Sequence, residues 1–198
     1  MNTFTNTAAT TAAVANRIVT STNMIVGAYS IANASPVWAG AALITVTHTE
    51  VGGGVDTLGT IVVVGKDLSG QTRTDTITPV NGTTATGTIP FRSVTSVTGV
   101  GWAIGTGNDT ITVGVAAGNI VCGSGGQLYG VLVNNTVAAT VTIADASRTI
   151  MTIPASQAAG TFYEIPGVDC AGYLKVSTTS TNDVTVFHTG TLPTVYAS

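Results

Sequence analysis

Charged residues are scarce in this sequence. Only 8% of its 198 residues are charged, against about 25% in an average soluble domain. The formal net charge is -3 and the pI is near 5.0, so the chain has no basic field to attract a phosphate backbone. We therefore expect no nucleic-acid partner. A surface with so few charges is unusual for a freely diffusing monomer, and burial in an assembly would explain it.

Cysteine and histidine are also scarce, which limits the chemistry available to the chain. Cys122 and Cys170 form no CxxC pair and no Cys/His cluster with metal-ligand spacing, so we predict two free, mostly buried thiols. A disulfide between them stays open as an alternative. His48 and His188 each continue an apolar strand face, and we predict that both are rim histidines rather than catalytic bases.

The familiar signatures of catalysis and of phosphate or metal binding are missing. No serine lies in a GxSxG elbow, and neither GxGxxG nor GxxxxGK[ST] occurs. Most of the acidic residues fall at predicted turns, which leaves no convincing carboxylate pair for glycoside hydrolysis and no DxDxDG calcium loop. The sequence therefore predicts no enzyme activity, no cofactor and no metal site. The acidic residues at predicted turns are Asp56, Asp67, Asp109, Asp145 and Asp183.

Long apolar runs and targeting signals are missing as well. Residues 1–16 lack a basic region followed by an apolar one, so we expect no signal peptide. No apolar run approaches the roughly 18 residues that a membrane-spanning helix needs. We therefore expect no membrane partner.

Threonine and glycine are abundant, and they favour β-structure. About one residue in five is threonine, and Thr, Val and Ile are β-branched residues that prefer strands. Residues 59–97 carry the clearest pattern: an apolar run, a turn at 67–70, a strand of alternating threonines, and a second turn at Asn81-Gly82. This pattern predicts two β-hairpins in tandem.

The remaining strands suggest two domains. Short strands are expected near 17–20, 24–28, 42–50, 93–98 and 110–115, and six more follow residue 119 at a spacing of about 8 to 12 residues. We predict an all-β fold of two small antiparallel β-sandwich or jelly-roll-like domains, 41–118 and 119–198, preceded by an extended N-terminal arm, 1–40. Asn108-Asp109 and Asn182-Asp183 each precede an alternating strand, and we attribute this echo to turn chemistry rather than to duplicated modules.

The predicted arm is rich in Thr, Ala and Asn, but it also carries apolar residues that are unlikely to remain in water. We expect it to dock on its own domain or on a neighbouring subunit. The residues predicted to form an interface are Phe4, Ile25, Tyr29, Val37 and Trp38.

Two stretches carry a family likeness. The run DTLGTIVVVGKDLSGQTRTDTITPVNGTTATGTIPFRSVTSVTGVGW with the following GNDTITVGV, from Asp56 to Val115, resembles a recurring segment of tailed-bacteriophage virion structural proteins. The C-terminal run from ATVTIADASRTIMTIP to DVTVFHTG resembles small β modules of phage head and tail accessory proteins. Together the two stretches cover well over half of the chain.

The resemblance implies a capsid decoration (cement) protein that binds and stabilises the lattice of the major capsid protein. Such a protein would be made in the bacterial cytoplasm and would lie on the capsid surface of the virion as a homo-oligomer, a dimer or a trimer. One alternative is a neck, tail or head-fibre component. Another is a surface carbohydrate-binding β module that uses Trp102 and tyrosines.

Overall fold

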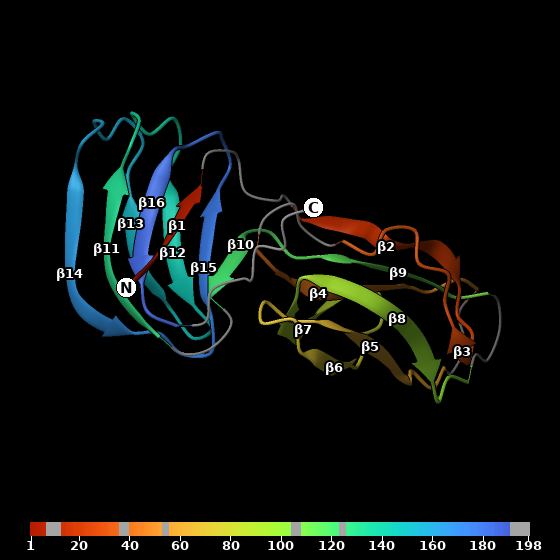
Figure 1. Cartoon of the computed structure of the whole chain (residues 1–198). Helices are drawn as coiled ribbons and strands as arrows, with labels where there is room; N and C mark the ends of the chain where they lie inside the picture. The colour runs from red at the N-terminus through yellow and green to blue at the C-terminus, as the bar shows by residue number, and fades with distance from the viewer. Residues whose placement is uncertain (7–12, 36–39, 53–55, 104–107, 123–125, 191–198) are drawn as a thin grey trace. The chain divides into compact units, whose positions relative to one another are not determined.

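The computed structural model describes residues 1–6, 13–35, 40–52, 56–103, 108–122 and 126–190. These residues form antiparallel sheets and contain no helix, which confirms the predicted all-β fold. The chain divides into two compact units (Figure 1). We call residues 13–116 the inserted unit, and residues 1–12 with 117–198 the split unit, because the first interrupts the second in sequence.

The inserted unit is a sandwich of two four-stranded sheets, with strand orders β2-β9-β4-β7 and β3-β8-β5-β6. Apolar residues of both sheets alternate inward and form one core, in which Ile44, Val46, Ile61 and Val63 are fully buried. The strands are β2 (Val14–Asn23), β3 (Gly27–Ala28), β4 (Ala42–Thr49), β5 (Thr60–Lys66), β6 (Thr72–Ile77), β7 (Thr84–Phe91), β8 (Ser93–Val100) and β9 (Thr110–Val115).

The split unit is a second sandwich, with sheets ordered β1-β16-β11-β14 and β10-β15-β12-β13. Its core is separate from the first and includes Val131, Ile143, Val176 and Val186. The strands are β1 (Asn2–Asn6), β10 (Asn119–Cys122), β11 (Gln127–Val133), β12 (Val141–Asp145), β13 (Thr149–Ile153), β14 (Phe162–Asp169), β15 (Leu174–Thr178) and β16 (Val184–His188).

The two units share one topology. When the eight strands of each unit are numbered in chain order, both units have one sheet ordered 1-8-3-6 and another ordered 2-7-4-5. This is the strand order of a jelly roll, the fold class that the strand spacing had suggested. The inserted unit lies, in sequence, between the first and second strands of the split unit.

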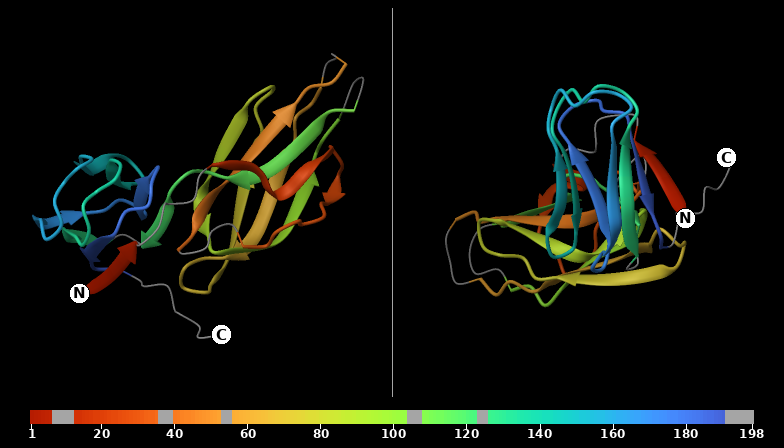
Figure 2. Two further views of the ribbon diagram at one scale, coloured as in Figure 1. Left: turned by 90° about the horizontal axis from the view of Figure 1, so that it is seen from above. Right: turned by 90° about the vertical axis from the view of Figure 1, so that its left-hand side faces the viewer.

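The N-terminal segment is not an arm that precedes the domains. β1 pairs antiparallel with β16 in the split unit (Figure 2). In this pairing Phe4 lies opposite Val186, whereas β2 and β3 pair with β9 and β8 in the inserted unit. The described part of residues 1–40 therefore supplies strands to both jelly rolls. β1 was not predicted, because Phe4 is the one apolar side chain within it and lies between two threonines.

One of the two predicted hairpins is also wrong. β5 and β6 form the first hairpin as expected, and Asp67 Oδ1 accepts hydrogen bonds from the backbone N–H groups of Ser69 (2.9 Å) and Gln71 (3.0 Å) in its turn. β7, however, pairs with β4 in the other sheet. The Asn81-Gly82 turn therefore joins the two sheets instead of closing a hairpin. Turn residues alone do not distinguish these two connections.

A buried carboxylate connects the two sheets close to the strands that this turn joins. Asp75 on β6 is buried, and its Oδ2 accepts hydrogen bonds from the backbone N–H groups of Thr88 (2.8 Å) and Ile89 (3.1 Å) on β7. The β4–β7 ladder breaks at this place, between the pairs Leu43–Pro90 and Thr45–Thr86. Asp75 thus satisfies two backbone donors that the ladder leaves without a strand partner.

We predict that Asp75→Ala destabilises the inserted unit by about 2 to 4 kcal/mol, because two backbone donors lose their acceptor. Asp75→Asn keeps one side-chain oxygen as an acceptor, so it should cost clearly less. Chemical unfolding of both variants, followed through NMR signals of the inserted unit, measures the difference. Equal losses in the two variants would contradict this role of the carboxylate.

A second pair of variants tests the contribution of β1. Phe4 packs against the core of the split unit, so Phe4→Ala should destabilise that unit by about 2 kcal/mol, somewhat less than a fully buried phenylalanine. Thr3 is exposed on the same strand, and Thr3→Ala should change stability by no more than about 0.5 kcal/mol. Hydrogen exchange at the β16 amides provides the readout. If the β16 amides are equally protected from exchange in the two variants, β1 does not stabilise the unit in solution.

Candidate functional site

The five predicted interface residues do not form one surface. Phe4 packs against the core of the split unit, and Tyr29 is buried in the inserted unit. The Tyr29 hydroxyl donates to the carbonyl of Ile25 (3.1 Å) and accepts from its N–H (2.9 Å), which fixes the loop before β3. Ile25 itself is 46% exposed and stays an interface candidate. Val37 and Trp38 lie outside the described residues.

An apolar patch does surround Ile25. Val26 is 67% exposed and Val100 is 46% exposed. Gly27 pairs with Gly99 between β3 and β8, so antiparallel register places Val26 beside Val100 at this end of the ladder. We call Ile25, Val26 and Val100 the β3 edge patch, because β3 is an edge strand of its sheet.

Both histidines lie at strand ends on the core side, but they are buried rather than at an exposed rim. His48 Nε2 lies 2.8 Å from Asp109 Oδ2, and both side chains are inaccessible to solvent. Asp109 Oδ1 accepts a hydrogen bond from the backbone N–H of Val51 (2.8 Å). That bond, and then the hydrogen bond and charge of His48, hold the pKa of Asp109 below its usual value despite burial. The pair ties β4 to the start of β9.

His188, which ends β16, is fully buried, and its Nδ1 lies 3.1 Å from the carbonyl oxygen of Thr189. Burial lowers the pKa of His188 by disfavouring the imidazolium form. Both histidines are thus enclosed in the interiors of their own units. The sequence pattern located their strands but did not indicate this burial.

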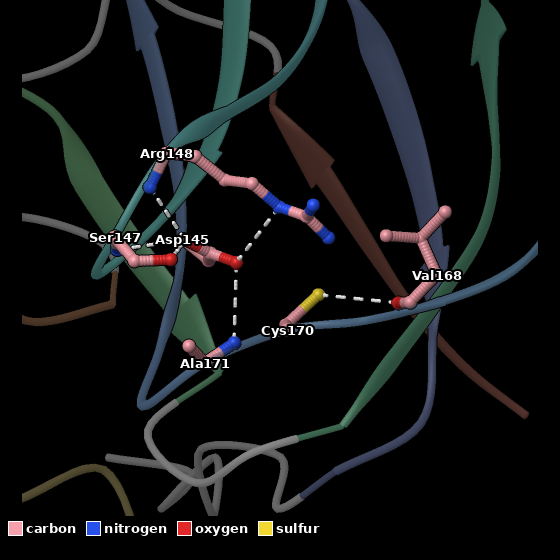
Figure 3. Close-up of polar contacts among 6 residues, drawn as sticks. All are labelled: Asp145, Ser147, Arg148, Val168, Cys170 and Ala171. Atoms are coloured by element: carbon pink, nitrogen blue, oxygen red, sulfur yellow. Dashed lines mark hydrogen bonds and ion pairs between the residues drawn. The ribbon is translucent and has the colours of Figure 1, made fainter.

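Asp145 is the centre of a polar cluster in the split unit (Figure 3). Its Oδ1 accepts from the N–H (2.7 Å) and hydroxyl (2.8 Å) of Ser147 and from the N–H of Arg148 (2.8 Å). Its Oδ2 accepts from the N–H of Ala171 (3.2 Å). Burial would raise the pKa of Asp145, but these hydrogen bonds outweigh burial and lower the pKa to about 2. The carboxylate joins the turn after β12 to the segment before β15.

The two thiols are free and buried, as predicted. Cys170 lies beside the Asp145 cluster, and its Sγ donates to the carbonyl of Val168 at 3.6 Å (Figure 3). Burial first, and then the negative charge of Asp145, raise the pKa of Cys170. A thiol with a raised pKa carries little thiolate at neutral pH, so neither the location nor the charge of Cys170 suits a nucleophile.

One hollow is open to solvent on the outer face of the sheet β1-β16-β11-β14. Its volume is about 430 Å³, and it is lined mainly by Met1, Tyr129, Phe162, Glu164, Pro166 and Phe187. Phe162 and Phe187 meet edge to face, with ring centroids 5.7 Å apart and an angle of 82° between the planes. The sequence analysis identified none of these residues, because they come together from strands that are distant in the chain.

Two classes of site are not found in the part of the chain that the structure describes. No group of three or more His, Cys, Asp or Glu side chains there could hold a metal ion. The same residues include no helix long and apolar enough to cross a membrane.

Comparison with known proteins finds no relative of this chain: no family model, no curated protein and no solved structure matches it.

The hydrogen bonds of Asp145 should make the stability of the split unit depend on pH in the acid range. Because its pKa falls from 3.8 in the unfolded chain to about 2 in the fold, Asp145 stabilises the split unit fully above pH 4 or so and progressively less toward pH 2. The contribution is about 2 kcal/mol. The Asp145→Asn variant should therefore be less stable than the wild type at pH 5. Its stability should also fall less than that of the wild type between about pH 5 and pH 2.5.

Chemical unfolding at several pH values measures this effect. The control is Asp169→Asn, which removes an exposed carboxylate from β14 and should leave the acid dependence nearly unchanged. Parallel pH profiles for wild type and Asp145→Asn would refute the assignment.

Proposed function

We propose that this chain is a non-enzymatic structural protein of a phage particle, and most specifically a capsid decoration protein that binds and stabilises the lattice of the major capsid protein. The proposal begins from the resemblance carried by Asp56 to Val115 and by the C-terminal stretch. It includes a location on the capsid surface and self-association as a dimer or trimer. Two jelly rolls with few charged residues are suited to this role, since a surface that is buried against other subunits does not need charge to stay in solution.

The observation that carries the proposal is the β3 edge patch. Among the described residues, seven large apolar side chains are exposed, and three of them come from this one sheet edge. Contiguous exposed apolar surface on a folded domain commonly marks an interaction site. An edge strand of two residues also leaves neighbouring backbone groups open to pairing with another strand.

The mechanism would be thermodynamic. A decoration subunit that binds the assembled lattice, and does not bind separate capsid subunits, stabilises the lattice by mass action. The described titratable side chains support a structural role, because His48, Asp109 and Asp145 make their hydrogen bonds within their own units. Such groups are buried and fixed instead of being presented to a substrate.

The alternatives receive less support. Trp102, which the carbohydrate-binding alternative would use, is half-buried and packs against the core of the inserted unit. A neck, tail or head-fibre role would use the same apolar patch. Copy number per particle separates the two roles, since a protein that covers the capsid lattice would be present in far more copies than a neck or tail component.

Binding to capsids that lack the protein tests the proposal. Removing residues 1–38 is unsuitable, because it deletes strands of both jelly rolls. Val26→Asp instead places a charge in the exposed patch without disturbing the core, and it should weaken co-sedimentation with capsids by at least about tenfold. Val80→Asp is the matched control, since Val80 is 51% exposed outside the patch.

Equal binding of the two variants and the wild type would exclude the β3 edge patch as the contact. A failure of wild-type protein to bind any capsid form would overturn the decoration role itself. Circular dichroism of both variants confirms that the folds are intact.

A further inference from the structure

Beside the hollow in the split unit, the Phe162 ring covers a glycine, Gly130. Phe187 on β16 and Glu164 on β14 both pair with Gly130 on the central strand β11. A side chain at Gly130 would collide with the Phe162 ring, because a Cβ atom there would lie 2.6 Å from that ring. The sheet therefore leaves a gap between an aromatic ring and a carboxylate, and Phe162 leans into it.

A β-bulge places the third aromatic ring. Against β16 the pairing shifts from Leu128–His188 to Gly130–Phe187, so Tyr129 is an extra residue in β11. Against β14 the register also shifts here, but the extra residues lie on β14, between Glu164 and Val168. Its hydroxyl donates to Gln127 Oε1 at 2.6 Å, and Gln127 Nε2 donates to Asp169 Oδ1 at 2.8 Å. This chain of hydrogen bonds holds the ring at the wall of the hollow.

The lining is more apolar than the rest of the unit's surface. Phe162 is 51% exposed and Met1 is 78% exposed, and they are the two large apolar side chains that the split unit exposes among its described residues. Both line this hollow. A ligand that covers them would therefore gain apolar contact as well as contact with the rings.

The charge in the hollow selects the class of ligand. The Glu164 side chain is exposed, and its carboxylate makes no hydrogen bond or ion pair with any described residue. The faces of aromatic rings carry negative electrostatic potential, so rings and carboxylate together attract a cation and repel an anion. A neutral apolar ligand would instead cover the carboxylate without compensating its charge.

We propose that the hollow binds an alkylammonium group, seated against the exposed surface of the Phe162 and Phe187 rings and paired with the Glu164 carboxylate. The aromatic rings contact the alkyl groups that surround the positive nitrogen, and Glu164 supplies the opposite charge. The inference does not depend on the capsid role, since the β3 edge patch belongs to the inserted unit.

Titration of the full chain with choline, followed by NMR, tests the proposal. Choline has a neutral carbon isostere, 3,3-dimethylbutan-1-ol, that matches its shape and lacks its charge. We expect choline to shift the backbone amide signals of Gly130, Phe162 and Phe187 and to bind about tenfold more tightly than the isostere. Equal affinities, or no shifts at the highest shared concentration, would overturn the proposal.

Three variants separate charge from shape. Glu164→Gln should weaken choline several-fold and leave the isostere unchanged, whereas Phe162→Leu should weaken choline by removing a ring face while keeping apolar volume. Glu50→Gln makes the same chemical change at an exposed glutamate of the inserted unit and should have no effect. An unchanged choline affinity in Glu164→Gln would remove the carboxylate from the site.

The same titration distinguishes two sources of the ligand. Choline represents a free quaternary ammonium compound, and Nα-acetyl-lysine amide represents a lysine side chain of a partner protein. Tighter binding of the first indicates a small-molecule ligand, and tighter binding of the second indicates a protein contact. Both outcomes support the alkylammonium site, and loss of binding by both excludes it.

Discussion

Carboxylates that accept hydrogen bonds from backbone N–H groups hold the ends of the strands in both units. The chain has nine acidic residues, and among the contacts of the described residues Asp67, Asp75, Asp109 and Asp145 bind backbone donors directly. Sheets leave such donors wherever a strand ends or bulges, and a buried donor without a partner is costly. Several of the few acidic residues therefore stabilise turns and the connection between sheets instead of facing solvent.

The recurring Asn-Asp pair occupies the same place in the strand order of both jelly rolls. Asp109 precedes β9 and Asp183 precedes β16, and each of these is the eighth strand of its unit. Each aspartate also contacts the end of the third strand: Asp109 bonds His48 on β4, and Asp183 accepts a hydrogen bond from Asn134 (2.6 Å), just after β11. The echo thus reflects shared strand topology as well as turn chemistry.

The alternation of residues along the sequence predicted where strands lie, but not which distant strands pair with one another. β9 and β11 begin and end where the alternation of apolar and polar residues places them. β10 was missed because all four of its residues are buried and show no alternation. The burial of His48 depends on a carboxylate 61 residues away, which no window of sequence reveals. The hollow depends on the register of β11 against two neighbours, although Tyr129-Gly130 within a strand is a recognisable sign of a bulge.

The place of β1 in the split unit sets an order of folding during synthesis. Thr5 bonds Thr185, which is 180 residues further along the chain. At ribosomal rates of about 5 to 20 residues per second, β1 leaves the ribosome roughly 10 to 40 s before its partner strand exists. All eight strands of the inserted unit are complete within that interval. The inserted jelly roll can therefore fold while β1 is still unpaired, and closing the split unit is the last step, with a long loop to close.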